Sequence, residues 1–171
     1  MIRKLTYTAT AFLILISALA CGKKTDEQQA RKITGWDISS FTEGKSAPPK
    51  PIPLPGNLVV KVPESVKSKY HTVTMGIGDR KTLEVKKFSV KIGDTAKVPG
   101  TDYSIKIVAY LPSWVIRGNV ATSKSDKPDD PAVRATVYEK GKQVFDGFIF
   151  QRHTTPSFLT DKYAIGLLGA S

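Results

Sequence analysis

Cysteine and histidine are scarce in this chain of 171 residues. Cys21 is the only cysteine, and His71 and His153 are the only histidines. A single cysteine excludes a disulfide within the chain. Zinc and copper sites are built mainly from Cys and His ligands, so three such residues provide too few donors. We therefore expect no metal ion of this kind and no metal-dependent catalysis.

Recognisable catalytic groupings are also lacking. The nearest one surrounds His153 and contains Thr154, Thr155, Ser157 and Asp161, but it does not resemble a nucleophile elbow. Solvated loop residues explain the same group. We predict that the protein is not an enzyme and carries no cofactor.

Asp126, Asp129 and Asp130 are the remaining candidates for a metal ion, because carboxylate oxygens are ligands for calcium. Their spacing, interrupted by Pro128 and Pro131, differs from that of an EF-hand loop. Turns in which Asp side chains bond to the backbone before a strand explain these residues as well. We predict no metal here either.

The N-terminus has the three parts of a secretory signal peptide. Arg3 and Lys4 provide the positive charge, the apolar run 9–19 follows, and small residues precede Cys21. Eleven residues rise about 16 Å as a helix, which is too short to span a bilayer. Residues 18–20 (Ala-Leu-Ala) also suit ordinary cleavage and secretion, and a retained N-terminal helix is a third alternative.

The cysteine favours lipoprotein processing over these alternatives. Leu19-Ala20-Cys21-Gly22 resembles the cleavage site of bacterial lipoproteins, and a free thiol would be a liability in an oxidising compartment. We predict a signal peptide at residues 1–20 and lipid attachment at Cys21, with the bilayer as the first partner. By resemblance to enterobacterial sorting, Gly22 in place of Asp favours the outer membrane, with the protein facing the periplasm.

Residues 21–57 lack the apolar periodicity of a folded element and predict a disordered, proline-rich tether. Trp36, Ile38 and Phe41 interrupt its polarity, either as a docking segment for the domain or a partner, or as a transient cluster. Residues 48–55 hold five prolines in eight positions. Such a run prefers polyproline II and makes a spacer of roughly 25 Å.

Basic residues outnumber acidic ones, and the formal net charge is +11. Removal of Arg3 and Lys4 with the signal peptide leaves +9. Such a charge suits binding to an anionic envelope polymer or lipid head groups, and solubility alone also explains it. Lys outnumbers Arg 20 to 6, although Arg is the better residue for recognition of phosphate.

Residues 58–171 predict a single β domain. Alternating apolar residues, punctuated by Gly and Pro, indicate strands at 59–62, 72–77, 82–92, 96–98, 103–111, 132–138, 144–150 and 163–168, and residues 114–116 add an apolar cluster. Residues 63–67 suit one helical turn, and the parity change within 82–92 predicts a bulge near Lys86. Eight or nine short strands favour an antiparallel β-sandwich or a partly closed barrel.

Several short motifs within this domain resemble a known family. They are Val-Pro-Gly-Thr at 98–101, Ala-Tyr-Leu-Pro at 109–112, the acidic loop and strand start at 125–133, Gly-Lys at 141–142, Gly-Phe-Ile-Phe at 147–150, and 156–163. Over residues 59–168 the chain resembles domain-of-unknown-function family 2155, which implies a bacterial envelope protein without an established activity. Phe148 stands where the family usually has Trp, and Thr160-Asp161 where it has His-Pro. Residues 111–150 also resemble the extracytoplasmic part of ResB-type cytochrome c biogenesis proteins.

Aromatic residues with basic neighbours are the best candidates for a recognition surface, because aromatic and Arg side chains are enriched at interfaces. The candidates are Tyr110, Trp114, Arg117, Phe148, Arg152, Phe158 and Tyr163. Packing in the core of a small sandwich explains the aromatic members equally well.

Together these observations predict a lipid-anchored envelope lipoprotein whose β domain binds or scaffolds without catalysis. The expected partner is another envelope protein or an anionic envelope polymer, and no nucleic acid is expected. An alternative, which rests on the second resemblance, is an accessory factor in membrane-associated assembly such as cytochrome c maturation.

Overall fold

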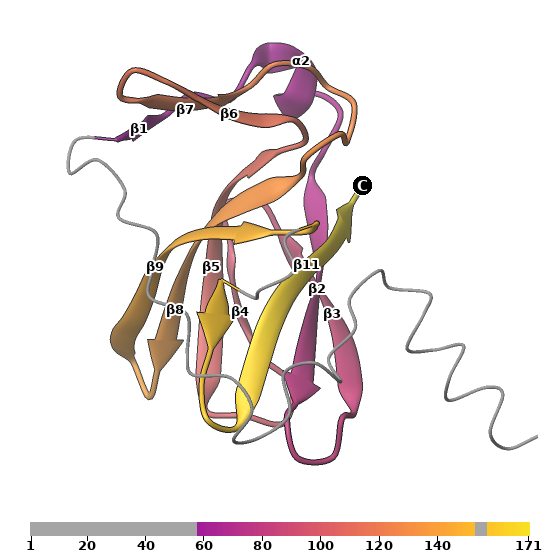
Figure 1. Ribbon diagram of the computed structural model, residues 1–171, viewed down its shortest axis with the longest axis vertical. Helices are drawn as coiled ribbons and strands as arrows, with labels where there is room; N and C mark the ends of the chain where they lie inside the picture. The colour runs from indigo at the N-terminus through magenta and orange to yellow at the C-terminus, as the bar shows by residue number, and fades with distance from the viewer. Residues whose placement is uncertain (1–57, 153–156) are drawn as a thin grey trace, which may run out of the picture.

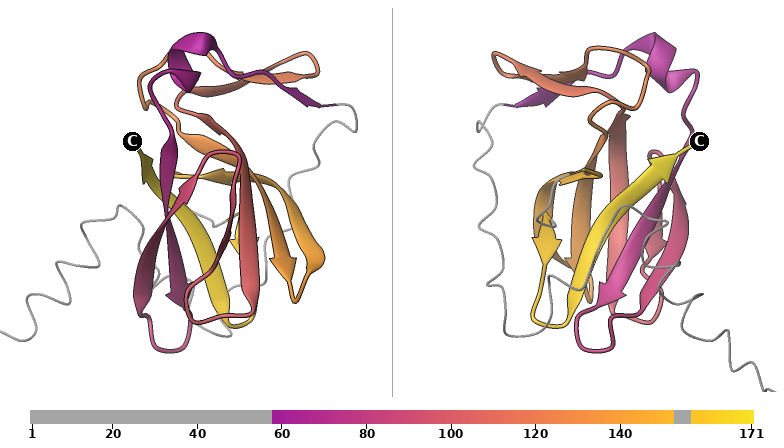
Figure 2. Two further views of the ribbon diagram at one scale, coloured as in Figure 1. Left: turned by 180° about the vertical axis from the view of Figure 1, so that it is seen from behind. Right: turned by 45° about the vertical axis from the view of Figure 1, so that its right-hand side comes forward.

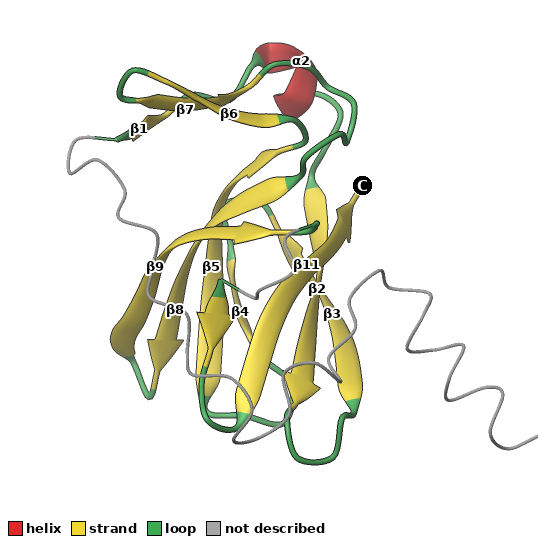
Figure 3. Cartoon of the chain, viewed as in Figure 1, coloured by secondary structure: helices red, strands yellow, loops and turns green. Residues whose placement is uncertain are grey.

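The computed structural model describes residues 58–152 and 157–171, which are mostly β-strand (Figure 1 and Figure 3). One helical turn, α2 (Glu64–Lys67), accompanies eleven strands. The strands are β1 (Val59–Val60), β2 (Thr72–Asp79), β3 (Val85–Lys91), β4 (Thr95–Lys97), β5 (Tyr103–Leu111), β6 (Trp114–Arg117), β7 (Val120–Ser123), β8 (Ala132–Glu139), β9 (Lys142–Phe150), β10 (Phe158–Leu159) and β11 (Tyr163–Ala170). The predicted fold class is confirmed, whereas the expected count of eight or nine strands is too low.

Three sheets make up the domain. The β2 sheet has the strand order β10-β11-β2-β3, the β5 sheet has the order β4-β5-β8-β9, and the end sheet has the order β1-β7-β6. The first two face each other, and the end sheet lies across one end of the pair (Figure 1). Because the sheets remain separate, the arrangement is sandwich-like and not a closed barrel.

The main core lies between the β2 and β5 sheets. The alternation expected at residues 72–77 is present: the side chains of Val73, Met75 and Ile77 lie on one face of β2 and are buried in the core. The hairpin expected at Lys140-Gly141 joins β8 to β9, and both residues have positive φ (50° and 84°). Two positive φ values fit the type of turn that matches the twist of paired strands.

The β5 strand departs from the expected alternation at Val108. The pairing with β8 shifts register between Ile107 and Ala109, which leaves Val108 as an extra, 47 % exposed residue. A bulge moves every later side chain to the other face of the sheet. As a result Tyr110 joins the main core, and Leu111 joins a second cluster on the outer face.

The bulge expected near Lys86 is absent, because β2 and β3 pair in continuous register from Gly78↔Val85 to Thr72↔Lys91. The apparent change of parity arises because the strand begins only at Val85. Residues before it form a turn in which Leu83 has a φ of 60°. The Asp79 carboxylate accepts hydrogen bonds from the backbone N–H groups of Lys81 (2.8 Å) and Thr82 (3.0 Å) and so holds this turn.

The end sheet covers a second hydrophobic cluster on the outer face of the β5 sheet. Its buried members are Leu111, Ala121, Ala132, Phe148 and Phe150, and Trp114 packs against them. The Trp114 ring meets Phe150 edge to face with centroids 5.0 Å apart. β1 pairs in parallel with β7, which ties the start of the described chain to this end of the molecule.

Candidate functional site

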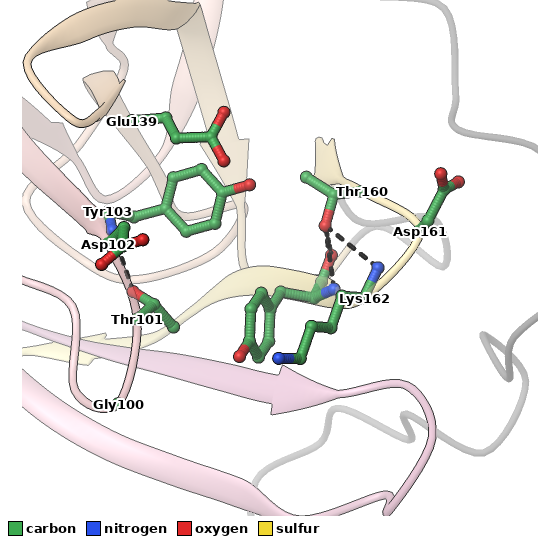
Figure 4. Close-up of a pocket in the computed structure, with 9 residues that line it drawn as sticks. Gly100, Thr101, Asp102, Tyr103, Glu139, Thr160, Asp161 and Lys162 are labelled. Atoms are coloured by element: carbon green, nitrogen blue, oxygen red, sulfur yellow. Dashed lines mark hydrogen bonds between the residues drawn. The ribbon is translucent and has the colours of Figure 1, made fainter.

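A polar pocket (Figure 4) opens where β5 and β11 begin and β8 ends. These strand ends lie at the end of the sandwich opposite the end sheet (Figure 1). It has a volume of about 660 Å³. The segments around the starts of β5 and β11 and the end of β8 provide its lining, which consists of Gly100, Thr101, Asp102, Tyr103, Glu139, Thr160, Asp161, Lys162 and Tyr163. We call this site the tyrosine pocket.

Two threonine-centred turns position its tyrosines. The Thr101 hydroxyl donates to the Val98 carbonyl at 3.0 Å and accepts from the Tyr103 N–H at 3.1 Å. In the second turn the Thr160 hydroxyl accepts from the Tyr163 N–H at 2.9 Å, a contact drawn in Figure 4. Each hydroxyl thus satisfies backbone groups at the start of a strand, which fixes where the following tyrosine emerges.

The two tyrosine rings pack against each other across the sandwich. The Tyr103 and Tyr163 centroids lie 6.2 Å apart with an interplanar angle of 87°. Phe158 supports Tyr103 from within the core, with its ring edge to face at 5.7 Å. Because the rings hold each other in place, they offer a pre-formed aromatic surface to a ligand.

The charges around the rings are mixed, with acidic groups in excess. Asp102, Glu139 and Asp161 contribute three carboxylates, and Lys162 lies 5.0 Å from the centroid of the Tyr163 ring. Lys140 pairs with Asp102 at 3.6 Å, but both side chains are exposed, so this ion pair contributes little.

The phenol of Tyr103 stays protonated over the physiological range. Burial raises its pKa, and the nearby Glu139 carboxylate raises the pKa further. The interaction with Tyr163 raises the pKa of Lys162, and its ammonium is charged. The pocket therefore presents hydroxyl donors, carboxylate acceptors and aromatic edges, which together suit non-covalent recognition.

A second pocket of about 460 Å³ lies at the other end of the sandwich, below α2. Tyr70 and Tyr110 line it, with their ring centroids 4.9 Å apart, and the Tyr70 hydroxyl donates to the Asp126 carbonyl at 2.9 Å. Burial raises the pKa of Tyr110 to about 12, with a smaller contribution from Tyr70. Lys67 and Lys91 provide positive charge at its rim.

The five aromatic residues among the seven predicted to form a recognition surface lie in three separate places. Trp114 and Phe148 pack together in the second cluster, where Phe148 is only 4 % exposed. Tyr110 is buried beside the second pocket, and Phe158 and Tyr163 belong to the tyrosine pocket or its support.

The two basic members of the set are exposed. Arg117 ends β6, and the Arg152 guanidinium donates to the Pro128 carbonyl at 3.3 Å. The seven residues therefore do not share one surface. The bulge at Val108 turns Tyr110 into the main core, and the end sheet covers Phe148 in the second cluster.

Tyr103, Glu139 and Thr160 are pocket residues that the sequence interpretation missed. Tyr103 and Glu139 are partners in the β5–β8 ladder, yet 36 positions separate them in the chain. One local pattern could have indicated the pocket. Thr160 lies two residues before Lys162 and three before Tyr163, and this spacing suits a turn in which the threonine hydroxyl bonds to the backbone.

Two of the three aspartates in the acidic loop at 125–133 form ion pairs with lysines. Asp126 forms an ion pair with Lys69 at 3.1 Å, and Asp129 forms one with Lys124 at 3.4 Å. Within residues 58–152 and 157–171, no three His, Cys, Asp or Glu side chains lie close enough together to hold a metal ion. Cys21, the tether and His153 lie outside the described residues.

Comparisons of the chain with family models, curated proteins and solved structures yield no match. The resemblance to family 2155 therefore stays a prediction. In the part of the chain that the structure describes, no helix has the length and apolar character needed to cross a membrane.

Proposed function

We propose that the protein is a lipid-anchored envelope lipoprotein whose β-sandwich binds another envelope protein without catalysis. The signal sequence and Cys21 support the anchoring. The observation that carries the binding role is the tyrosine pocket, in which Tyr103 and Tyr163 are held rigidly beside three carboxylates.

The position of the pocket suits contact with a partner. Leu58, where the described chain begins, lies at the end sheet, and the tyrosine pocket lies at the far end of the sandwich (Figure 1). An anchor attached through the N-terminal segment therefore leaves this pocket accessible from the side away from the point of attachment.

The chemistry of the pocket favours a polypeptide segment that carries Lys or Arg. Carboxylates accept hydrogen bonds from ammonium and guanidinium groups, and tyrosine rings attract cations and pack against their aliphatic stems. Asp102, Glu139 and Asp161 supply the first kind of contact, and Tyr103 and Tyr163 supply the second.

Affinity capture of the full-length lipidated protein after crosslinking in the native envelope tests this role. Tyr163→Ala should lose a partner that the wild type captures, whereas Val144→Ala, an exposed change on β9, should retain it. Identical captured sets for the wild type and Tyr163→Ala would reject the pocket as the binding site. Loss of a haem-maturation protein would favour the alternative role in cytochrome c assembly.

An anionic envelope polymer is a second candidate partner, because β3, β4 and β5 carry four exposed lysines that form no ion pair with a described carboxylate. Lys87 and Lys91 lie on the outer face of the β2 sheet, and Lys97 and Lys106 lie on the outer face of the β5 sheet. Binding that weakens steeply with salt, and with Lys97→Gln, would favour this partner.

A further inference from the structure

The outer face of the β2 sheet has almost no side chains at its centre. Ala164 pairs with Gly78, and Gly166 pairs with Gly76. Their neighbours Ile77, Met75, Ile165 and Leu167 are core residues, so these four small residues occupy the opposite face. We call them the small-residue face.

Larger apolar residues flank this face. Leu159 on β10 pairs with Ala164, and Val85 on β3 pairs with Gly78. Leu159 and Ala164 form a separate hydrophobic cluster, against which Val85 and Leu168 pack. The outer face of a two-layer sandwich usually carries polar side chains. Here an apolar strip stands in their place.

The small residues of the strip have little exposed surface. Ala164 is 0 % exposed, and Gly76, Gly78 and Gly166 are all buried. No described element lies over this face (Figure 2). The side chains of Leu159, Val85 and Leu168 enclose Ala164 from the sides, and the strip between them is an apolar sheet face without a described partner.

Two stretches of the chain lie outside the description, and they differ in character. Residues 153–156 (His-Thr-Thr-Pro) carry no large aliphatic side chain. Residues 36–41 carry Trp36, Ile38 and Phe41 within a polar surrounding, and Trp36 and Ile38 alternate with Asp37 as the side chains of an extended segment would.

We propose that residues 36–41 dock on the small-residue face, with Trp36 and Ile38 packed between Leu159 and Val85. The small-residue face leaves room for aromatic and aliphatic side chains that larger residues on an ordinary outer face would exclude. Lys87, which pairs with Gly76 on the same face, lies where it can meet Asp37. The proposal does not depend on the function of the tyrosine pocket.

The length of the connecting chain allows this docking. Sixteen residues lie between Phe41 and Leu58, and an extended chain of that length reaches about 55 Å. The eight residues of β11 span about 27 Å. A docked segment leaves only residues 22–35 to connect Cys21 with the domain, so docking would hold the domain closer to the membrane than a free tether would.

Disulfide trapping in the mature chain tests the proposal. Cys21→Ser removes the only native thiol. Ile38→Cys is then combined with Lys87→Cys beside the small-residue face, or with Lys106→Cys, an exposed lysine on the outer face of the β5 sheet. We expect the 38–87 disulfide to form within one chain at least about tenfold faster than the 38–106 disulfide.

A further substitution separates docking from mere tethering. Trp36→Asp, which lies outside the β domain, should lower the 38–87 rate to that of the 38–106 pair. Equal rates for the two pairs, or a fast 38–87 rate that persists in Trp36→Asp, would overturn the proposal. Disulfides between two copies of the chain at micromolar concentration would overturn it in favour of a dimer.

Discussion

Tyr110→Phe offers a quantitative test of how the bulge at Val108 places Tyr110. Burial raises the pKa of this phenol to about 12, against an ordinary value near 10. Between these values the unfolded chain loses the proton and the folded chain keeps it, so the unfolded state binds fewer protons and stability falls as pH rises. The penalty at pH 11 is at most about 1.4 kcal/mol, one pH unit above the unfolded pKa.

Phenylalanine cannot ionise and should abolish this penalty. We expect Tyr110→Phe to lie within about 1 kcal/mol of the wild type at pH 7, and to gain up to about 1.4 kcal/mol relative to it at pH 11. Urea unfolding at the two pH values measures both differences. Because the variant is compared with the wild type at each pH, the contributions of the lysines and the other tyrosines to the free energy of unfolding cancel.

Val108→Ala, an exposed change on the bulge itself, is the matched control. Its difference from the wild type should be the same at both pH values, since it alters no titrating group. A Tyr110→Phe difference that is equally insensitive to pH would mean that Tyr110 ionises in the folded state as it does in the unfolded state. The inward placement of Tyr110 would then be wrong.

Three other predictions concern the second cluster, the β2–β3 turn and the anchor. Phe148→Ala should lower the free energy of unfolding by about 3–5 kcal/mol, because the ring is buried between Trp114 and Phe150; urea unfolding with a loss below 1 kcal/mol would contradict this packing. The backbone N–H groups of Thr82 and then Lys81 lower the pKa of Asp79, so its contribution is present above the unfolded pKa and is lost as pH falls through the folded one. Asp79→Ala should therefore destabilise by about 1 kcal/mol at pH 7 and by less at pH 3, and equal losses at both would refute this. Cys21→Ser should leave the protein unprocessed and free of lipid, which metabolic labelling with a fatty acid and membrane fractionation would check; unchanged processing and labelling would disprove lipidation.

Local patterns predicted a large part of the fold. The alternation of Val73, Met75 and Ile77 identified β2 and its buried face, and Lys140-Gly141 identified the turn of a hairpin. Both features depend on interactions within a few residues, which is why they can be recognised in an unfolded chain.

The exceptions arose where a partner strand decides the geometry. Nothing in 103–111 distinguishes Val108 from its neighbours, because the bulge exists only against the register of β8. The bulge predicted within 82–92 is wrong for a related reason. The Asp79 carboxylate accepts hydrogen bonds from the turn that follows it, and the strand therefore begins only at Val85.

The candidate site was less accessible from the sequence than the fold. Tyr163 was predicted as a site residue for its chemistry alone, and of the rings proposed to join it only Phe158 lies nearby, behind Tyr103. Tyr103 and Glu139 become neighbours only through strand pairing, and Tyr163 reaches them only when the two sheets close over the core.

The sequence by itself determined the β class of the domain, the positions of most strands and the prediction of an anchor at Cys21, because these depend on composition, alternation and spacing along the chain. Tertiary structure alone decided which aromatic rings reach the surface, where the tyrosine pocket forms and that the outer face of the β2 sheet is apolar. Those features depend on register, and a single extra residue in one strand reverses the faces of all that follow.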